Sequence, residues 1–248
     1  MAPINFHILS IFPDMFEGFK KSSIISRAIN NGFVTISIYD IRQFTDDKHN
    51  TTDDYQFGGG TGMVMKPEPI YYAVKYILKN CADINNTPVI LLTPQGTLFS
   101  QEAAQGFSTY SDIIYICGHY TGIDERIKDL LVTHEISIGD FIVTGGEIPA
   151  MLVCDCISRC IPGVIGAQSN VESDSITSGL LEHPLYTRPR SFKGMDVPDI
   201  LVNGDHNKIS TWRRKESLKR TLLTRPDLLE KYPLSLSDQN LLHELQDE

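Results

Sequence analysis

The stretch Val89-Ile90-Leu91-Leu92-Thr93-Pro94-Gln95-Gly96 decides the fold class of this 248-residue chain. It opens with a short run of apolar side chains, and the proline and glycine that follow can end a strand. Such a run, bounded by turn residues, is typical of a strand buried in a parallel sheet. Outward from it, strand-like and helix-like segments alternate. This alternation predicts an α/β domain with a mostly parallel sheet and helices on both faces.

The elements of this domain are expected from the period of the apolar residues. The expected strands are residues 4–11, 34–39, 89–93, 113–117 and 141–144. The expected helices are residues 14–29, 68–78, 100–105, 124–131 and 148–161. The last helix is apolar almost all the way round, so it must be buried on every side, which favours a subunit interface. Its three cysteines have no partner cluster with zinc spacing, and we interpret them as small buried apolar side chains.

The composition changes after residue 166, and this change predicts a second domain. The first domain spans residues 1–166. Residues 167–177 are polar and are expected to form a flexible linker. Residues 178–248 are expected to form a smaller, mainly helical C-terminal domain. Its helical patterns lie at residues 210–223, 226–231 and 237–245.

The overall composition excludes several classes of protein. The chain is 41% hydrophobic and 21% charged, which indicates a globular protein. No apolar run is long enough to span a bilayer, and the first residues lack the basic region of a secretory signal. We therefore expect no membrane partner. The five cysteines are expected to be reduced thiols of a cytoplasmic protein.

The net charge of −9 hides an uneven distribution. Between residues 186 and 225, ten basic side chains stand against four acidic ones. A basic stretch on an acidic body suits a phosphate-bearing partner that is held at one place, whereas a solvated helix face is the alternative. The ten basic residues are Arg188, Arg190, Lys193, Lys208, Arg213, Arg214, Lys215, Lys219, Arg220 and Arg225.

Glycines follow several of the expected strands, where open α/β sheets bind ligands. They indicate either a nucleotide-like pocket or ordinary turns. The run Gly58-Gly59-Gly60-Thr61-Gly62 fails the dinucleotide fingerprint, because Met63 stands where a third glycine is needed. The chain also has no phosphate-binding P-loop, GxSxG elbow or HExxH motif. The strand-end glycines are Gly96, Gly118, Gly122, Gly139, Gly145 and Gly146.

A series of motifs runs in order along nearly the whole chain. They are FGGGTGMVM (57–65), LTPQG (92–96), CGHYTGIDER (117–126), SIGDF (137–141), TGGEIPAM (144–151), RCIPGV (159–164), LLEHPLYTRP (180–189) and WR (212–213). Together they resemble the bacterial tRNA (guanine-N1)-methyltransferase family, TrmD. Two departures stand out. His119 and Thr121 replace the Arg and Glu of the family's usual GRYEG, and Tyr55-Gln56 replaces an Arg-Pro pair after Asp53-Asp54.

The resemblance implies a SPOUT fold, with a deep trefoil knot in the first domain, and a homodimer. It also implies S-adenosylmethionine as the methyl donor, held bent in the knot loops, and it allows Mg²⁺ as a further cofactor. It assigns no protein ligands to a metal. The residues implied in donor binding are Leu91, Leu92, Thr93, Pro94, Gly96, Gly118, Tyr120, Thr121, Ile138, Gly139, Val143, Gly145 and Gly146.

The reaction implied by the resemblance is methylation of N1 of the guanosine at tRNA position 37. N1 of neutral guanine carries a proton, so a carboxylate must accept it, and a cation can stabilise the charge that develops on O6. The resemblance places the base at Asp174 and the cation at Arg159, with Asp174 of one subunit acting on a donor held by the other. The alternative for Asp174 is a solvated loop carboxylate, and the alternative for Arg159 is a helical ion pair with Asp155.

Recognition of tRNA is expected to involve the second domain, with Trp212 as a core residue rather than a stacking platform. Two other functions stay open from the sequence. A different SPOUT methyltransferase would modify a ribose 2′-oxygen or another base, and an RNA-binding module with a vestigial pocket would not bind the donor. The residues expected to bind substrate are Asp54, Ser175, Arg188, Arg190, Arg213, Arg214, Lys215 and Arg220.

Overall fold

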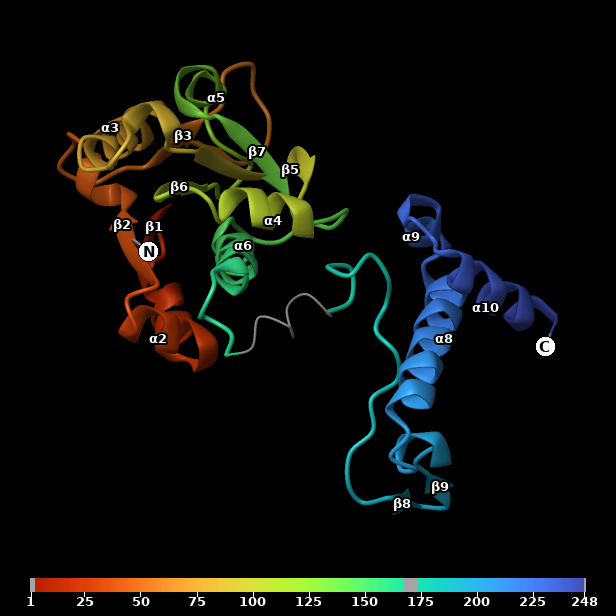
Figure 1. Cartoon of the computed structure of the whole chain (residues 1–248). Helices are drawn as coiled ribbons and strands as arrows, with labels where there is room; N and C mark the ends of the chain where they lie inside the picture. Colours follow the sequence, from red (N-terminus) through yellow and green to blue (C-terminus); the bar gives the residue numbers. More distant parts are fainter. Residues whose placement is uncertain (1–2, 167–173, 248) are drawn as a thin grey trace. The chain divides into compact units, whose positions relative to one another are not determined.

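A computed structural model describes residues 3–166 and 174–247 of the chain. The described residues form two compact units, which divide between residues 166 and 167 (Figure 1). Each unit is considered by itself. Of the expected linker, residues 167–173 lie outside the described part, and residues 174–177 begin the second unit with a bend and a turn.

Five parallel strands form the sheet of the first unit, in the order β2-β1-β6-β5-β7. They are β1 (Ile4–Ser10), β2 (Val34–Asp40), β5 (Val89–Leu98), β6 (Asp112–Cys117) and β7 (His134–Ser137). Every residue of the central strand β6 is buried, as required where helices cover both faces of a sheet. The predicted mostly parallel α/β fold is confirmed.

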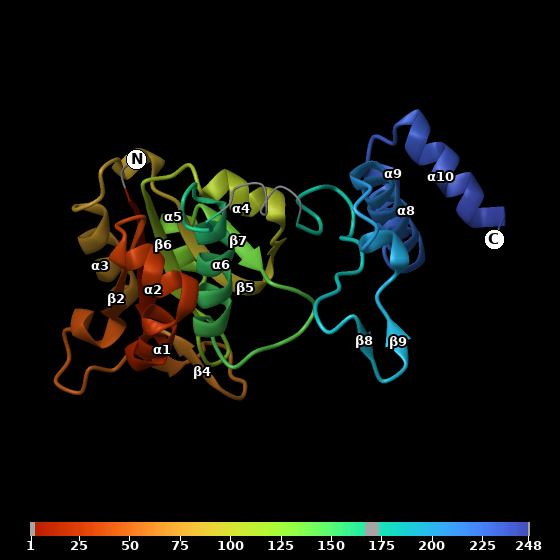
Figure 2. The same cartoon turned by 60° about the horizontal axis from the view of Figure 1, so that its bottom comes forward.

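Helices cover both faces of this sheet and create two cores (Figures 1 and 2). Alternate residues of β6 enter different cores, because successive side chains of a strand point to opposite faces: Tyr115 enters one core and Ile116 the other. The core around Tyr115 includes α2 (Ser23–Asn30), α4 (Gln101–Phe107) and α6 (Glu147–Cys160). The core around Ile116 includes α3 (Pro67–Leu78) and α5 (Arg126–Leu131).

The remaining elements of the first unit are short. The hairpin pairs β3 with β4 in antiparallel register. The elements are η1 (Pro13–Phe16), α1 (Glu17–Lys21), η2 (Ile41–Phe44), β3 (Asp53–Tyr55), β4 (Met63–Met65) and η3 (Ile84–Asn86).

The expected strand at residues 141–144 is wrong. The fifth strand is β7, which places Ile136 in the core, whereas Phe141 and Ile142 are 56% and 79% exposed in a loop. The apolar run was misread because its side chains line a cavity instead of packing into the sheet. The strand expected to end at Thr93 also runs on to Leu98. It does so by shifting register against β7, so the Pro-Gln-Gly segment is a bulge within the strand.

Two helix predictions also need correction. The helix expected over residues 14–29 is divided into η1, α1 and α2, with a break at Ser22 where the backbone is extended. Helix α6 is not buried on every side within one chain, since Ile148 and Leu152 are 50% and 40% exposed. Its other faces pack into the core, so a single uncovered apolar face remains.

The described residues of the second unit include three α-helices, a short 3₁₀ helix and a small hairpin. Its core gathers around Leu180, Leu218 and Leu241. No helix among the described residues of either unit is long and apolar enough to cross a membrane. The elements are β8 (Ser191–Phe192), β9 (Met195–Asp196), η4 (Asp199–Leu201), α8 (His206–Thr224), α9 (Pro226–Lys231) and α10 (Leu236–Asp247).

Candidate active site

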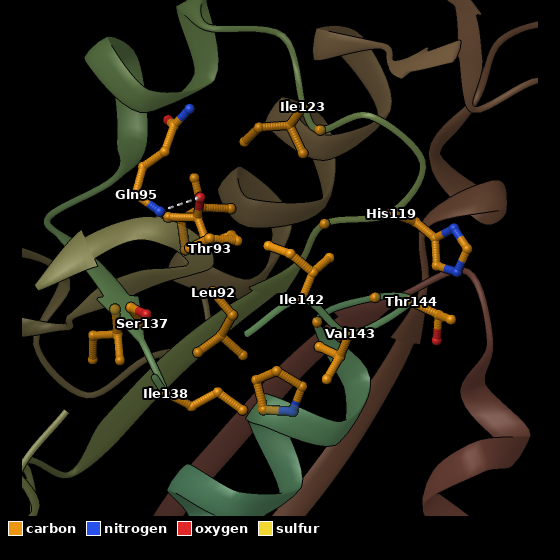
Figure 3. A pocket seen from close by; sticks show the side chains of 18 of the residues that line it. Leu92, Thr93, Gln95, His119, Ile123, Ser137, Ile138, Ile142, Val143 and Thr144 are labelled. Carbon is orange, nitrogen blue, oxygen red and sulfur yellow. Dashed lines mark hydrogen bonds between the residues drawn. The ribbon is translucent and has the colours of Figure 1, made fainter. Parts of the chain in front are cut away.

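A cavity of about 420 Å³ opens at the carboxyl ends of the central strands (Figure 3). Three segments form it: the end of β5, the loop that follows β6, and the loop between β7 and α6. Its lining residues are Leu91, Leu92, Thr93, Pro94, Gln95, Gly118, His119, Tyr120, Thr121, Gly122, Ile123, Glu125, Lys128, Ile136, Ser137, Ile138, Gly139, Phe141, Ile142, Val143, Thr144, Gly145, Gly146 and Pro149. The position and volume are typical of a small-molecule site.

The wall of the cavity depends on close backbone contact at Gly146. Its N–H donates to the carbonyl oxygen of Gly118 at 2.8 Å, which joins the loop after β6 to the start of α6. A Cβ atom at Gly146 would lie 2.6 Å from the Cα of Cys117, so only glycine fits there. The neighbouring residues His119 and Gly145 form a further bridge. The two loops are therefore held together by main-chain atoms.

All but one of the residues expected to bind the donor line this cavity. The exception is Gly96, which lies in the bulge of β5, where a Cβ atom would collide with the backbone of Glu135 and Ile136. Its role in the structure is to let the backbones of the neighbouring strands β5 and β7 approach closely at the bulge.

Several lining residues were not named individually from the sequence, although all but Ile123 and Ser137 of those labelled in Figure 3 lie within the donor loops that the resemblance implies, residues 91–96, 118–122 and 138–146. Those labelled in Figure 3 are Gln95, His119, Ile123, Ser137, Ile142 and Thr144. The run from Phe141 to Val143 gave a misleading signal, because an apolar stretch near glycines reads as a strand. Its position only a few residues before Gly145-Gly146 and after Gly139 would have indicated a loop instead.

The cavity offers apolar walls with polar groups at its edge. Leu92, Ile138 and Val143 project toward it (Figure 3). Nδ1 of the lining residue His119 is buried and has no hydrogen-bond partner among the described residues. Apolar side chains beside loop backbone groups fit a nucleoside whose base is buried and whose polar edge is read by N–H and C=O groups.

Lys128 places a cation at the rim. Its Nζ lies 2.8 Å from Oε1 of Gln95, 3.2 Å from Oε2 of Glu135 and 3.3 Å from Oε2 of Glu125. Burial alone would lower the pKa of Lys128, but the hydrogen bonds to the two carboxylates outweigh it and raise that pKa. The side chain is therefore held charged and is oriented by three oxygen atoms.

The two residues expected to do the chemistry belong to different units. Arg159 lies in the last turn of α6 and is half-buried. Asp174 is the first described residue of the second unit and is also half-buried. Its carbonyl oxygen accepts a hydrogen bond from the N–H of Ser178 at 3.1 Å, so the turn that follows it is formed.

The residues expected to bind substrate are distributed over both units. Asp54 is exposed on β3. In the second unit Arg188 and Arg213 are exposed. The others make local contacts: Arg190 with Asp199 at 2.8 Å, Lys215 with Glu244 at 3.4 Å, Arg220 with the carbonyl of Glu182 at 3.0 Å, and Ser175 Oγ with the N–H of Glu182 at 2.9 Å.

Arg214 differs from the other basic residues in this set. Its Nε and Nη2 donate to the carboxylate of Asp238 at 2.7 and 3.0 Å, and Nη2 also lies 3.2 Å from the hydroxyl of Tyr232. Asp238 is buried, and the hydrogen bonds from Arg214 and Ser235 hold its pKa well below the usual range. This guanidinium joins α8 to α10 and is already engaged within the unit.

One further cluster of titratable groups lies away from the cavity, at the amino ends of the strands. His7, Cys81 and Asp112 place one possible metal ligand each within 4.8 Å of the others. The carboxylate of Asp112 already accepts hydrogen bonds from His7, Asn5 and the N–H of Ala82. Burial alone would raise the pKa of Asp112, but these donors lower it, so the cluster is satisfied as a structural network.

The fold and the cavity define a class: an α/β protein that holds a ligand beyond the carboxyl ends of a parallel sheet. A comparison with known families narrows this class. The sequence profile described as tRNA (Guanine-1)-methyltransferase TrmD matches residues 4–231. The chain therefore belongs to the TrmD family.

Individual relatives agree with this assignment. A protein of Dictyoglomus turgidum is 50% identical over 245 residues, which cover 99% of this chain and 98% of the relative. One from Dehalococcoides mccartyi is 50% identical over 96% of this chain and 95% of its own length. One from Staphylococcus carnosus is 51% identical over 94% of each chain. All three are named tRNA (guanine-N(1)-)-methyltransferase.

Proposed function

We propose that this protein is a tRNA (guanine-N1)-methyltransferase that transfers a methyl group from S-adenosylmethionine to N1 of the guanosine at tRNA position 37. The observation that carries the proposal is the cavity. Its lining contains almost every residue that the family resemblance assigns to the donor, in a chain that matches the family nearly end to end.

The residues present fit the donor. Leu92, Ile138 and Val143 would cover the adenine ring, and the loops after β6 and β7 would contact the polar groups of the nucleoside. When bound, the donor supplies an electrophilic methyl group on a sulfonium. The contribution of the chain is to hold that ligand between loops that Gly118 and Gly146 join through their backbones.

Asp174 is proposed as the general base and Arg159 as the cation that faces O6. As the N1–methyl bond forms, the bond between the methyl group and the sulfonium sulfur would break and leave a neutral thioether. The N1–H bond of guanine breaks as well, and its proton passes to the carboxylate of Asp174. Negative charge that would gather on O6 is stabilised by the guanidinium of Arg159. Arg159 lies in the last turn of α6, at the opposite end from the cavity, so this role rests on the family resemblance and not on proximity to the cavity.

A homodimer with shared sites is part of the proposal. The uncovered side of α6 carries the apolar side chains of Ile148 and Leu152 in the first turns of the helix, near the cavity at which it begins. Burial of such side chains on a second copy would stabilise a dimer. Asp174 of one subunit would then serve the donor held by its partner.

The trefoil knot is likewise proposed. Its support is the family match, which covers residues 4–231.

The remaining expectations concern partners and location. Arg188, Arg190, Arg213, Lys215 and Arg220 are proposed to contact tRNA phosphates, with tRNA as the substrate and the cytoplasm as the compartment. Mg²⁺ is proposed as a further cofactor, and no chemical step is assigned to it. It could be held by RNA phosphates and one or two carboxylates, and the His7, Cys81 and Asp112 cluster offers softer ligands than Mg²⁺ prefers.

A methyl-transfer assay on tRNA transcripts tests the function. We expect transfer to a transcript with guanosine at position 37 and none when adenosine replaces it, with the product mapped to N1. Methylation of a ribose 2′-oxygen would indicate a different methyltransferase. Absence of saturable S-adenosylmethionine binding in calorimetry would indicate a binding module, and either outcome would overturn the proposal.

A further inference from the structure

The β3–β4 hairpin carries two aromatic side chains that the mechanism above does not use. Tyr55 ends β3, and Phe57 follows it in the turn; they are 81% and 102% exposed. Large rings that protrude into water contribute nothing to the core of this unit. Aromatic rings are, however, strong contributors to interfaces, so an exposed pair marks a contact surface.

The hairpin is attached directly to the wall of the cavity. The N–H and Oγ1 of Thr121 both lie within hydrogen-bond distance of the carbonyl oxygen of Met63, at 3.1 and 2.7 Å. The N–H of Met65 donates to the carbonyl of Gly122 at 2.9 Å, and its side chain is fully buried. The exposed rings are therefore fixed to the loop that lines the proposed donor site.

The turn has a shape that places Phe57 outside. Gly58, Gly59 and Gly60 have φ angles of 85°, 80° and 129°, which other residues rarely adopt. The side chain of Gln56 folds back over Gly60 and occupies the place of a Cβ atom there. Gln56 thus packs within the turn, and Phe57 next to it projects away.

The charge of the hairpin indicates what it contacts. No lysine or arginine occurs between residues 49 and 65, and Asp53 and Asp54 add negative charge. Such a surface repels phosphates and also a second copy of itself. Flat aromatic faces attract the faces of unpaired bases, because every base can stack on a ring. Base faces are therefore the complementary partner, and the nucleic acid backbone is not.

We propose that Tyr55 and Phe57 form a stacking platform for unpaired bases of the tRNA anticodon loop beside the methylated guanosine. This inference rests on the proposed function, because the RNA must bring its loop to the cavity. The basic residues of the second unit would hold phosphates by charge, whereas the hairpin would hold bases without charge. The two contributions can be separated by their dependence on salt.

The test measures binding of an anticodon stem-loop at several salt concentrations. We expect Phe57→Ala and Tyr55→Ala each to weaken binding roughly 5- to 100-fold, the range for loss of one base–aromatic stack. The slope of log K against log salt should not change, whereas Arg213→Ala should reduce it. Phe57→Trp should retain affinity, and Phe57→Leu should not, because leucine is apolar but cannot stack.

Matched controls keep the result interpretable. Ile84→Ala removes an apolar side chain that is 54% exposed in η3, before the amino end of β5, and it should leave RNA binding unchanged. Calorimetry with S-adenosylmethionine should give the same affinity for the wild type and all hairpin variants, and melting temperatures should match. A hairpin variant that lost donor binding or stability would show a structural role and would overturn the platform.

Other outcomes separate this inference from the function on which it rests. If the wild type methylates guanosine 37 but Phe57→Ala binds RNA equally well, the platform is wrong and the function stands. If Phe57→Leu restores full affinity, the contact is apolar and not stacking. If the variants lose dimerisation while keeping RNA affinity, a second copy occupies the hairpin. If the wild type does not methylate tRNA, the proposed function itself fails.

Discussion

At the scale of a single residue, a substitution of Gly146 tests whether the close backbone contact in the cavity wall is needed. In Gly146→Ala the added Cβ would meet the backbone of Cys117 and Gly118. We expect weaker binding of S-adenosylmethionine and a decrease in the free energy of unfolding of about 2 kcal/mol, because backbone cannot move aside as a flexible side chain can. Calorimetry and urea unfolding measure the two effects.

Gly106→Ala is the matched control. Gly106 lies in α4 and has nothing within 4 Å of the position of a Cβ atom. Alanine there should raise the free energy of unfolding by about 0.5 kcal/mol, because it favours the helix. Equal effects of the two substitutions would contradict the close contact at Gly146.

Asp174 is the residue on which the proposed proton transfer depends. We expect Asp174→Asn to keep donor and tRNA affinity while kcat falls about 10²- to 10⁴-fold, because the amide cannot accept the N1 proton. Single-turnover methyl transfer measures this directly. Asp227→Asn, the same substitution at an exposed carboxylate of α9, should retain turnover within a few-fold. Near-normal turnover of Asp174→Asn would remove this residue from the mechanism.

At the scale of elements, the Arg214–Asp238 pair joins α8 to α10. The pKa of Asp238 is held below its usual range, chiefly by the hydrogen bond from Arg214. A lowered carboxyl pKa stabilises the fold above the unfolded-state value of about 3.9, and this contribution is lost as the pH falls through the lower folded-state value. We expect Asp238→Asn to lower the free energy of unfolding of the second unit by about 2 kcal/mol at pH 7.

The pH dependence provides the check on this prediction. The difference between wild type and Asp238→Asn should be constant from about pH 8 to pH 5 and should shrink below about pH 4. Asp227→Asn removes the carboxylate of an exposed ion pair with Arg225 and serves as the control, for which we expect no measurable change. A difference for Asp238→Asn that grew toward low pH would contradict the direction of the pKa shift.

Elements differ in how far the sequence could predict them. Strand β6 was predictable because it is an apolar run between a capped helix and a glycine, and the structure buries each of its residues. The run from Phe141 to Val143 has the same chemistry but lines a cavity. An apolar pattern in the sequence indicates side chains that favour burial. It does not show whether they pack into the sheet or line a ligand cavity.

The candidate site was predictable only with the family resemblance. Glycines after strands indicated a pocket at the correct edge of the sheet, but not its ligand. Residues such as Ile123 and Thr144 became part of the lining through loop geometry that no local pattern encodes. Arg214 was expected to bind substrate because of its charge, but it pairs with Asp238 within the unit. Asp238 is distant in sequence, so counting charges along the chain could not identify this pair.

At the scale of the whole molecule, the shared site can be tested by complementation. A chain with Asp174→Asn has an intact cavity, and a chain with Val143→Trp has a filled cavity but an intact base. Each should be inactive alone. Co-expressed, they should recover about one quarter of wild-type activity, because about half of randomly assembled dimers are mixed and each holds one complete site. No recovery, with mixed dimers confirmed by mass, would show that each chain works alone.

The main-chain hydrogen bonds between β4 and the loop from Thr121 to Gly122 would couple the proposed binding of S-adenosylmethionine to the proposed binding of tRNA. Any ordering of this loop by one ligand lowers the entropy that the other must lose on binding. Thermodynamic linkage then requires symmetry: if saturation with S-adenosylmethionine tightens tRNA binding by some factor, tRNA must tighten cofactor binding by that same factor. Hydrogen bonds no longer than 3.1 Å would in this way make the affinity for each of two very different molecules depend on the presence of the other.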